Sequence, residues 1–142
     1  MFVVDASVYA SIAVRDEFYK PSTAFLARSR DLGSVTLDLA LIEAYNVLWK
    51  HAYLLRRIPV SKCVSIAENL ERVFKNSVVR VYSAASECKD AVKLAVAYGI
   101  TIYDSTYLVL ARKLNYRLAT LDRKLEEKLR DTELRDLIYI LA

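Results

Sequence analysis

The chain has 142 residues, 55% hydrophobic and 27% charged, which predicts one folded domain over residues 1–142 and excludes disorder as its main state. With two glycines, one histidine and two cysteines, the sequence cannot supply a glycine-rich nucleotide-binding loop or a structural Cys/His zinc site. The net charge of +4 modestly favours anionic partners.

Apolar runs, capping residues and breakers predict strands and helices that alternate along the chain. Asp38 is expected to cap a long helix that Pro59 ends, and Gly99 is expected to end a later helix in the left-handed conformation. Ser61 and Ser83 are expected to cap helices of their own. The predicted strands are residues 2–5, 34–37, 78–82, 100–103, 117–120 and 137–141. The predicted helices are residues 6–14, 21–30, 39–58, 61–76, 83–98, 104–114 and 122–135.

This alternation predicts an α/β fold, a three-layer α/β/α sandwich whose mainly parallel sheet is covered by helices on both faces. Consecutive parallel strands would be joined by right-handed crossovers. Two glycines and two prolines are too few for the many turns of an all-β sandwich.

Three aspartates occupy the same kind of position, where a predicted strand gives way to a helix: Asp5, Asp104 and Asp122. In an open parallel sheet such strand ends lie along one edge, where ligands bind. Each aspartate alone is also a favoured helix N-cap. Three apolar strands that are all followed by Asp, rather than by Ser or Thr, are harder to explain as caps. We therefore expect the three carboxylates to converge.

Glu43 is the fourth candidate acid, because it lies on the inward stripe of an apolar helix, with Leu39, Ala40 and Val47 at helical spacing. An acid buried on such a stripe needs a partner or a metal ion. The alternative is that Glu43 interacts only with the positive N-terminal end of its own helix.

Four carboxylates without clustered His or Cys indicate a hard divalent cation, Mg²⁺ or Mn²⁺, which would also relieve the repulsion between like charges. Because Mg²⁺ takes only one or two protein carboxylates, four acids could hold two ions about 3.5–4 Å apart, as in two-metal phosphodiester hydrolysis. Without these four of the 17 acids, 21 basic residues oppose 13 acidic ones. Such a positive body would attract a polyanionic substrate.

Four segments of the chain carry a resemblance to a known family. They are VVDASVYA, IEAYNVLWK, IYDSTYLVLARKL and LATLDRKL, and they are spread over nearly the whole chain. In these segments and their order the chain resembles the PIN-domain ribonucleases, and more narrowly the VapC-type toxins of prokaryotic toxin–antitoxin pairs. The resemblance carries the family's acids over to Asp5, Glu43, Asp104 and Asp122.

We hypothesise separate roles for these residues. Asp5, Asp104 and Asp122 would be metal ligands, directly or through water, and Glu43 would ligate the metal or orient the attacking water. Ser7 and Thr120 match the family's hydroxyl residues and would orient the carboxylates. The family further implies strand order 3-2-1-4-5 and a Mg²⁺- or Mn²⁺-dependent endoribonuclease that acts on RNA. It also implies a homodimer and an antitoxin partner that blocks the site.

Two other enzyme and signalling classes place an Asp after the first strand. Phosphatases of the haloacid dehalogenase type have a second Asp two residues later, where this chain has Ser7. Response-regulator receivers want an acid near the first strand, where Val4 precedes Asp5, and a Lys on the last strand, which reads LIYIL. The remaining alternative is a non-catalytic RNA-binding or assembly module on the same fold.

The helix predicted at residues 39–58 is apolar nearly all round, so its outer face is expected to meet another protomer or a partner unless neighbouring helices cover it. The outer-face residues are Tyr45, Leu48, Trp49, Ala52, Tyr53 and Leu55.

No apolar run is long enough to span a membrane, and the start MFVVDAS does not resemble a signal peptide. The expectation is a cytoplasmic protein with no membrane partner.

Overall fold

A computed structural model describes all 142 residues and contains a five-stranded sheet in the order β3-β2-β1-β4-β5. All four strand pairs are parallel, which confirms the predicted sheet and strand order. The central strands are the most buried and the two edge strands are partly exposed. The strands are β1 (Phe2–Val4), β2 (Val35–Leu37), β3 (Arg80–Tyr82), β4 (Arg117–Thr120) and β5 (Ile138–Ile140).

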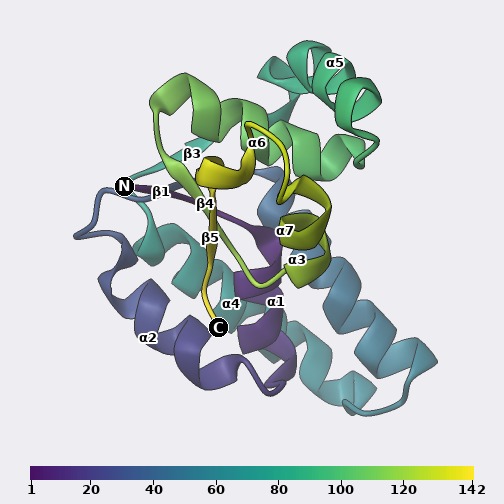
Figure 1. Cartoon of the computed structure of the whole chain (residues 1–142). Coiled ribbons are helices and arrows are strands. Elements are labelled where there is room, and N and C mark those ends of the chain that lie inside the picture. The colour runs from purple at the N-terminus through teal and green to yellow at the C-terminus, as the bar shows by residue number, and fades with distance from the viewer.

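Helices cover both faces of this sheet (Figure 1). Helices α1 (Ala6–Val14), α2 (Tyr19–Ser29), α3 (Leu39–Trp49) and α4 (Cys63–Ser77) pack against one another on one side. On the other side α6 (Ile102–Leu114) lies against β1 and β4, and α5 (Cys88–Tyr98) covers α6. The short α7 (Arg123–Leu129) follows β4. Because α6 lies between sheet and helix, seven successive residues from Ser105 to Ala111 are buried.

The register of the two central strands determines which residues meet at the carboxyl edge of the sheet. Val4 pairs with Ala119, and the ladder continues one residue further, because the backbone N–H of Asp5 donates to the carbonyl oxygen of Ala119 at 3.0 Å. Asp5 therefore leaves the sheet beside Thr120, and the segments that follow β1 and β4 start at the same edge.

The prediction of a strand at residues 100–103 is wrong. The chain enters α6 at Ile102, and Thr101 is the N-cap, because its hydroxyl oxygen accepts from the backbone N–H of Asp104 at 3.1 Å. The same hydroxyl donates to the Asp104 carboxylate at 2.7 Å. The Thr101 side chain thus binds both the backbone and the side chain of Asp104. Asp104 therefore lies in the first turn of a helix and does not follow a strand.

Several predicted helix limits and caps also differ. Asp38 precedes α3 without capping it, because its carboxylate accepts from the backbone N–H of Ala84 at 2.9 Å. Ser61 lies inside a 3₁₀ turn, η2 (Val60–Lys62), and Ser83 precedes another, η3 (Ala84–Ser86), so neither caps an α-helix. Helix α7 ends at Leu129 and not near residue 135. Gly99 does end α5 with a positive φ of 63°, as predicted.

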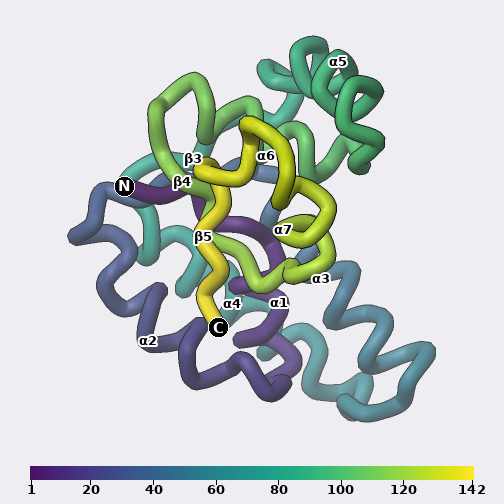
Figure 2. The backbone as a smooth tube through the Cα atoms, viewed as in Figure 1, coloured from purple at the N-terminus to yellow at the C-terminus, as the bar shows by residue number.

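The helix predicted at residues 39–58 is shorter than expected. Regular α-helix ends at Trp49 and continues as a single wider π-helical turn, η1 (Lys50–Leu54). The chain then turns at Arg56, which has a φ of 51°. Figure 2 shows the segment from α3 into α4 extending away from the rest of the chain.

The predicted outer face of this helix is only partly exposed. Leu48 and Ala52 are buried within the chain, and the Tyr45 hydroxyl donates to the carbonyl oxygen of Ala67 at 3.1 Å. Trp49 and Tyr53 remain 49% and 66% exposed, and their rings stack with centroids 5.8 Å apart. Leu55 is also exposed. The neighbouring helix α4 thus covers one edge of the face and leaves the aromatic pair free.

No single helix combines the length and apolar character needed to cross a bilayer. Helices α5 and α6 meet that test only when taken together, and the chain bends by 111° between them.

Candidate active site

The four acids singled out in the sequence line one cleft of about 530 Å³ at the carboxyl edge of the sheet. Asp5 follows β1, Glu43 lies on α3, Asp104 lies in the first turn of α6, and Asp122 precedes α7. The structure therefore brings together residues from four separate segments of the chain, although only two of the three aspartates follow strands.

Two hydroxyl groups hold the Asp5 carboxylate. Ser7 and Thr120 each donate to its Oδ2 atom at 2.6 Å. The same hydroxyl oxygens accept backbone N–H groups at 3.0 Å, Ser7 from Leu121 and Thr120 from Asp122. The carboxylate makes no capping bond to α1. Asp5 is thus fixed to the loop that carries Asp122, and helix capping does not account for it.

The other two aspartates differ from Asp5. Asp122 does cap α7, because its Oδ1 atom accepts from the backbone N–H of Leu125 at 3.0 Å. Asp104 is held by the Thr101 hydroxyl, which caps α6 and also donates to the Asp104 carboxylate. In each case the capping interaction positions a carboxylate that also faces the cleft, so a structural role and a chemical role coexist in one residue.

Glu43 has a partner that the sequence did not reveal. The hydroxyl of Tyr107 donates to its Oε1 atom at 2.8 Å, and the Tyr107 side chain is only 1% exposed. Tyr107 lies three residues after Asp104, which places both on the same face of α6. The spacing in the sequence could have indicated that Tyr107 lies beside Asp104. The contact between Tyr107 and Glu43, however, depends on how α6 and α3 are placed in the tertiary fold.

The pKa values of three of the acids are raised. Burial raises the pKa of Asp5 against the opposing effect of the Ser7 and Thr120 hydrogen bonds. Burial, with smaller contributions from the charges of Asp5 and Asp104, raises the pKa of Glu43 to about 7. Burial and the charges of Asp5 and Asp122 raise the pKa of Asp104. The carboxylates therefore repel one another across the cleft.

No basic side chain forms an ion pair with any of these four acids; the ion pairs of the protein join Lys75 to Glu71, and Lys113 to Glu87 and Asp90. No three carboxylate, imidazole or thiolate groups lie close enough together to form a ready-made metal site. The donor set consists of carboxylate and hydroxyl oxygens, which suits Mg²⁺ or Mn²⁺ and not a soft metal.

Three further polar residues line the cleft and were not among the predicted site residues. They are Asn46 and Lys50, which lie three and seven residues after Glu43, and Tyr103, which precedes Asp104. The helical spacing from Glu43 could have indicated the first two.

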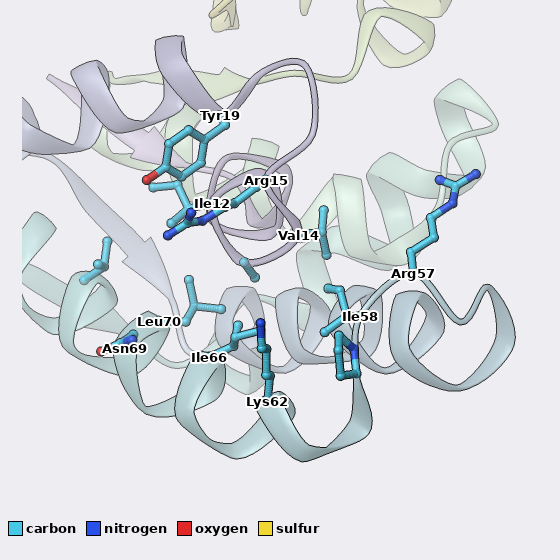
Figure 3. A pocket seen from close by; sticks show the side chains of 13 residues that line it. Ile12, Val14, Arg15, Tyr19, Arg57, Ile58, Lys62, Ile66, Asn69 and Leu70 are labelled. Carbon is cyan, nitrogen blue, oxygen red and sulfur yellow. The ribbon is translucent and has the colours of Figure 1, made fainter.

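A larger hollow of about 550 Å³ lies elsewhere, near the C-terminal end of α1, and holds none of the four acids. Apolar side chains such as Ile12, Ile66 and Leu70 line it, with Arg15 and Lys62 among them (Figure 3). It has no convergent acid or nucleophile. Size alone therefore does not locate the reactive site of this protein.

Three comparisons with known proteins agree with the fold. The PIN domain family model matches residues 2–129. Ribonuclease VapC3 of Pyrobaculum aerophilum is 41% identical over 128 residues, which cover 89% of this chain and 92% of that protein. Among crystal structures, PAE2754 from Pyrobaculum aerophilum matches with a TM-score of 0.69 at 24% identity, over 99% of this chain and 90% of that one. VapC20 of Mycobacterium tuberculosis, a toxin that cleaves the sarcin–ricin loop, matches with a TM-score of 0.68 at 20% identity, over 89% of this chain and 94% of that one.

The two crystal structures share the α/β/α sandwich, and at these identities they establish the fold alone. The family model and the 41% identical relative go further, since each extends over most of the chain. The chain belongs to the PIN-domain family, and within it to the VapC ribonucleases. The resemblance stated from the four sequence segments is confirmed.

Proposed function

We propose that this protein is a Mg²⁺- or Mn²⁺-dependent endoribonuclease that hydrolyses RNA phosphodiester bonds. The observation that carries the proposal is the set of four carboxylates, drawn from four segments, which line one cleft without a basic partner. Carboxylates that share a cleft repel one another, and a bound cation relieves that repulsion. A divalent cation of the kind that binds carboxylates supplies that relief.

The spacing of the acids is compatible with such an ion. Mg²⁺ keeps several of its waters and takes one or two protein carboxylates directly, so the remaining acids act through water and need not converge on one point. Asp5, Glu43, Asp104 and Asp122 would hold the ion or ions. When bound, the cation supplies Lewis acidity that lowers the pKa of water and stabilises negative charge on the phosphate.

The chain's own residues then have separate tasks. Ser7 and Thr120 both donate to the Oδ2 atom of Asp5. They hold the carboxylate in one orientation, which also fixes the direction of its other oxygen. Glu43, with a pKa of about 7, is suited to accept a proton from an attacking water near neutral pH. The Tyr107 hydrogen bond keeps the Glu43 carboxylate in one orientation while it does so.

The test is cleavage of a fluorescently labelled single-stranded RNA by the purified protein in EDTA, Mg²⁺ and Mn²⁺. We expect internal cleavage that requires the divalent ion and stops when EDTA is added in excess. Binding of the RNA without cleavage in any of these buffers would favour the non-catalytic RNA-binding module.

We also propose that the protein is the toxin of a type II toxin–antitoxin system and acts in the cytoplasm, with a cognate antitoxin that blocks the cleft. The similarity to Ribonuclease VapC3 supports this assignment. The antitoxin would be encoded beside this protein, as the resemblance to the toxin family implies.

A homodimer is the third part of the proposal. Its support is the exposed apolar surface of α3 and η1, where the stacked pair of Trp49 and Tyr53 continues to Ile42, which is 67% exposed. Large aromatic side chains are enriched at interfaces between subunits, so we propose a second copy of the chain as the occupant.

Light scattering coupled to size exclusion tests the dimer. We expect twice the chain mass of 16.2 kDa at micromolar concentration, and a shift towards the monomer for Trp49→Ala combined with Tyr53→Ala. The matched control is Val92→Ala with Val96→Ala, which removes exposed apolar side chains from α5. A monomeric wild-type chain would contradict the dimer.

A further inference from the structure

A second hollow, of about 370 Å³, opens directly from the carboxylate cleft. Asp104 and Asp122 line both spaces, so the two hollows adjoin at these aspartates. The walls of the second hollow change in character, because it contains two lysines, Lys124 and Lys128, together with Thr101. The acidic cleft therefore borders a hollow in which two lysines accompany two of the four acids.

The two lysines are available to bind a ligand. Both are exposed, and neither forms an ion pair with a carboxylate, in contrast to Lys75 and Lys113, which are paired within the chain. Lys128 donates to the backbone carbonyl oxygen of Gly99, which holds its ammonium group across the hollow. Its charge also acts on Asp104, where it opposes the burial that raises the pKa of that carboxyl.

We propose that the hollow lined by Thr101, Lys124 and Lys128 binds the RNA phosphate next to the one that is cleaved. This proposal rests on the ribonuclease function proposed above. A backbone that crosses the acids must place its neighbouring phosphates on either side of them. The two lysines balance Asp104 and Asp122 in this hollow, and once the proposed cation neutralises those aspartates the lysine charge is left to attract a phosphate. Lysine serves this purpose as a point charge that needs no fixed geometry.

The opposite side of the cleft offers matching chemistry. Lys50, two turns beyond Glu43, lines the cleft on the α3 side, is exposed and has no ion pair. The positive charge that the composition shows for the whole chain is thus found locally on both sides of the acidic centre. The backbone of the RNA would run from Lys50 over the four carboxylates to Lys124 and Lys128.

Fluorescence anisotropy with a labelled single-stranded RNA tests the proposal. All proteins carry Asp5→Asn and are measured in Mg²⁺, so that the probe stays intact. We expect Lys124→Gln combined with Lys128→Gln to raise the dissociation constant about tenfold. The slope of log K against log salt should fall in magnitude by about 1.4, because each contact to a single strand contributes about 0.7.

Two control proteins make the result specific. Lys20→Gln with Lys93→Gln removes the same charge from exposed positions on α2 and α5 that line neither hollow, and it should leave the slope unchanged. Lys124→Arg with Lys128→Arg keeps the charge and should bind as the parent does. Equal slopes for the two glutamine pairs would overturn the proposal. A wild-type chain that cleaves no RNA would instead refute the ribonuclease function, and the binding result would still decide this proposal.

Discussion

Asp5→Asn should reduce metal-dependent RNA cleavage by at least about 10³-fold while the protein stays folded. Asp5 faces the cleft with one oxygen already committed to Ser7 and Thr120, so the substitution removes a negative charge from the centre of the site and leaves its packing intact. A loss of this size corresponds to the several kcal/mol that a well-placed cation contributes to transition-state stabilisation.

The fold is expected to survive because burial raises the pKa of Asp5, which means that the folded state disfavours its charged form. The matched control is Asp38→Asn. Asp38 also follows a strand, β2, but its carboxylate accepts from Ala84 outside the cleft. Single-turnover cleavage rates with circular dichroism spectra of both variants make the measurement. Comparable activity of Asp5→Asn and wild type would contradict the assignment of Asp5.

Glu43→Gln should stabilise the metal-free protein at about pH 8 while it abolishes activity. The pKa of Glu43 is raised from its ordinary 4.5 to about 7 in the folded chain. Below about pH 4.5 the group is protonated in the folded and unfolded states, and its stabilising effect is fully present. That effect is lost as the pH rises towards 7, because the unfolded chain releases the proton and the folded chain retains it. Because Glu43 is only partly buried and solvent screens its charge, the loss amounts to about 1–2 kcal/mol.

Glutamine remains neutral at all these pH values and can still accept the Tyr107 hydrogen bond through its amide oxygen. The free energy of unfolding of the variant should therefore exceed that of wild type at about pH 8 and approach it at about pH 4. Urea unfolding in EDTA measures this difference. Glu68→Gln, at an exposed position on α4, serves as the control and should follow wild type at every pH. If the free energy of unfolding depended on pH in the same way for Glu43→Gln and wild type, the pKa of Glu43 would not be raised in the folded chain.

The raised pKa of Glu43 also connects stability with metal binding. A divalent cation that binds the carboxylates must displace any proton they hold, so its affinity should fall as the pH drops below about 7. The repulsion that destabilises the metal-free site is the same interaction that favours the cation. The carboxylates therefore destabilise the metal-free fold at this edge of the sheet, and the same carboxylates are required for function.

Local signals predicted well where they depend on adjacent residues. The central strands, most helices and the left-handed end of α5 at Gly99 were all expected from short apolar runs, caps and breakers. The strand at residues 100–103 was wrong because an apolar run of four residues suits a strand or a helix start equally, and Thr101 decided for the helix. The end of α3 was placed too late, because Pro59 indicated only the last position that the helix could reach.

The sequence by itself determined the chemistry of this protein: four acids without clustered histidines or cysteines, two hydroxyls beside the first and last of them, and a positive remainder. Only the tertiary structure decided which groups face one another. Tyr107 meets Glu43 across 64 positions of sequence, and Lys50, Lys124 and Lys128 border the acids while the other lysines do not. The reason is that capping and periodicity are set by neighbours in the chain, whereas contacts between α3, α6 and α7 follow from how helices pack on a common sheet.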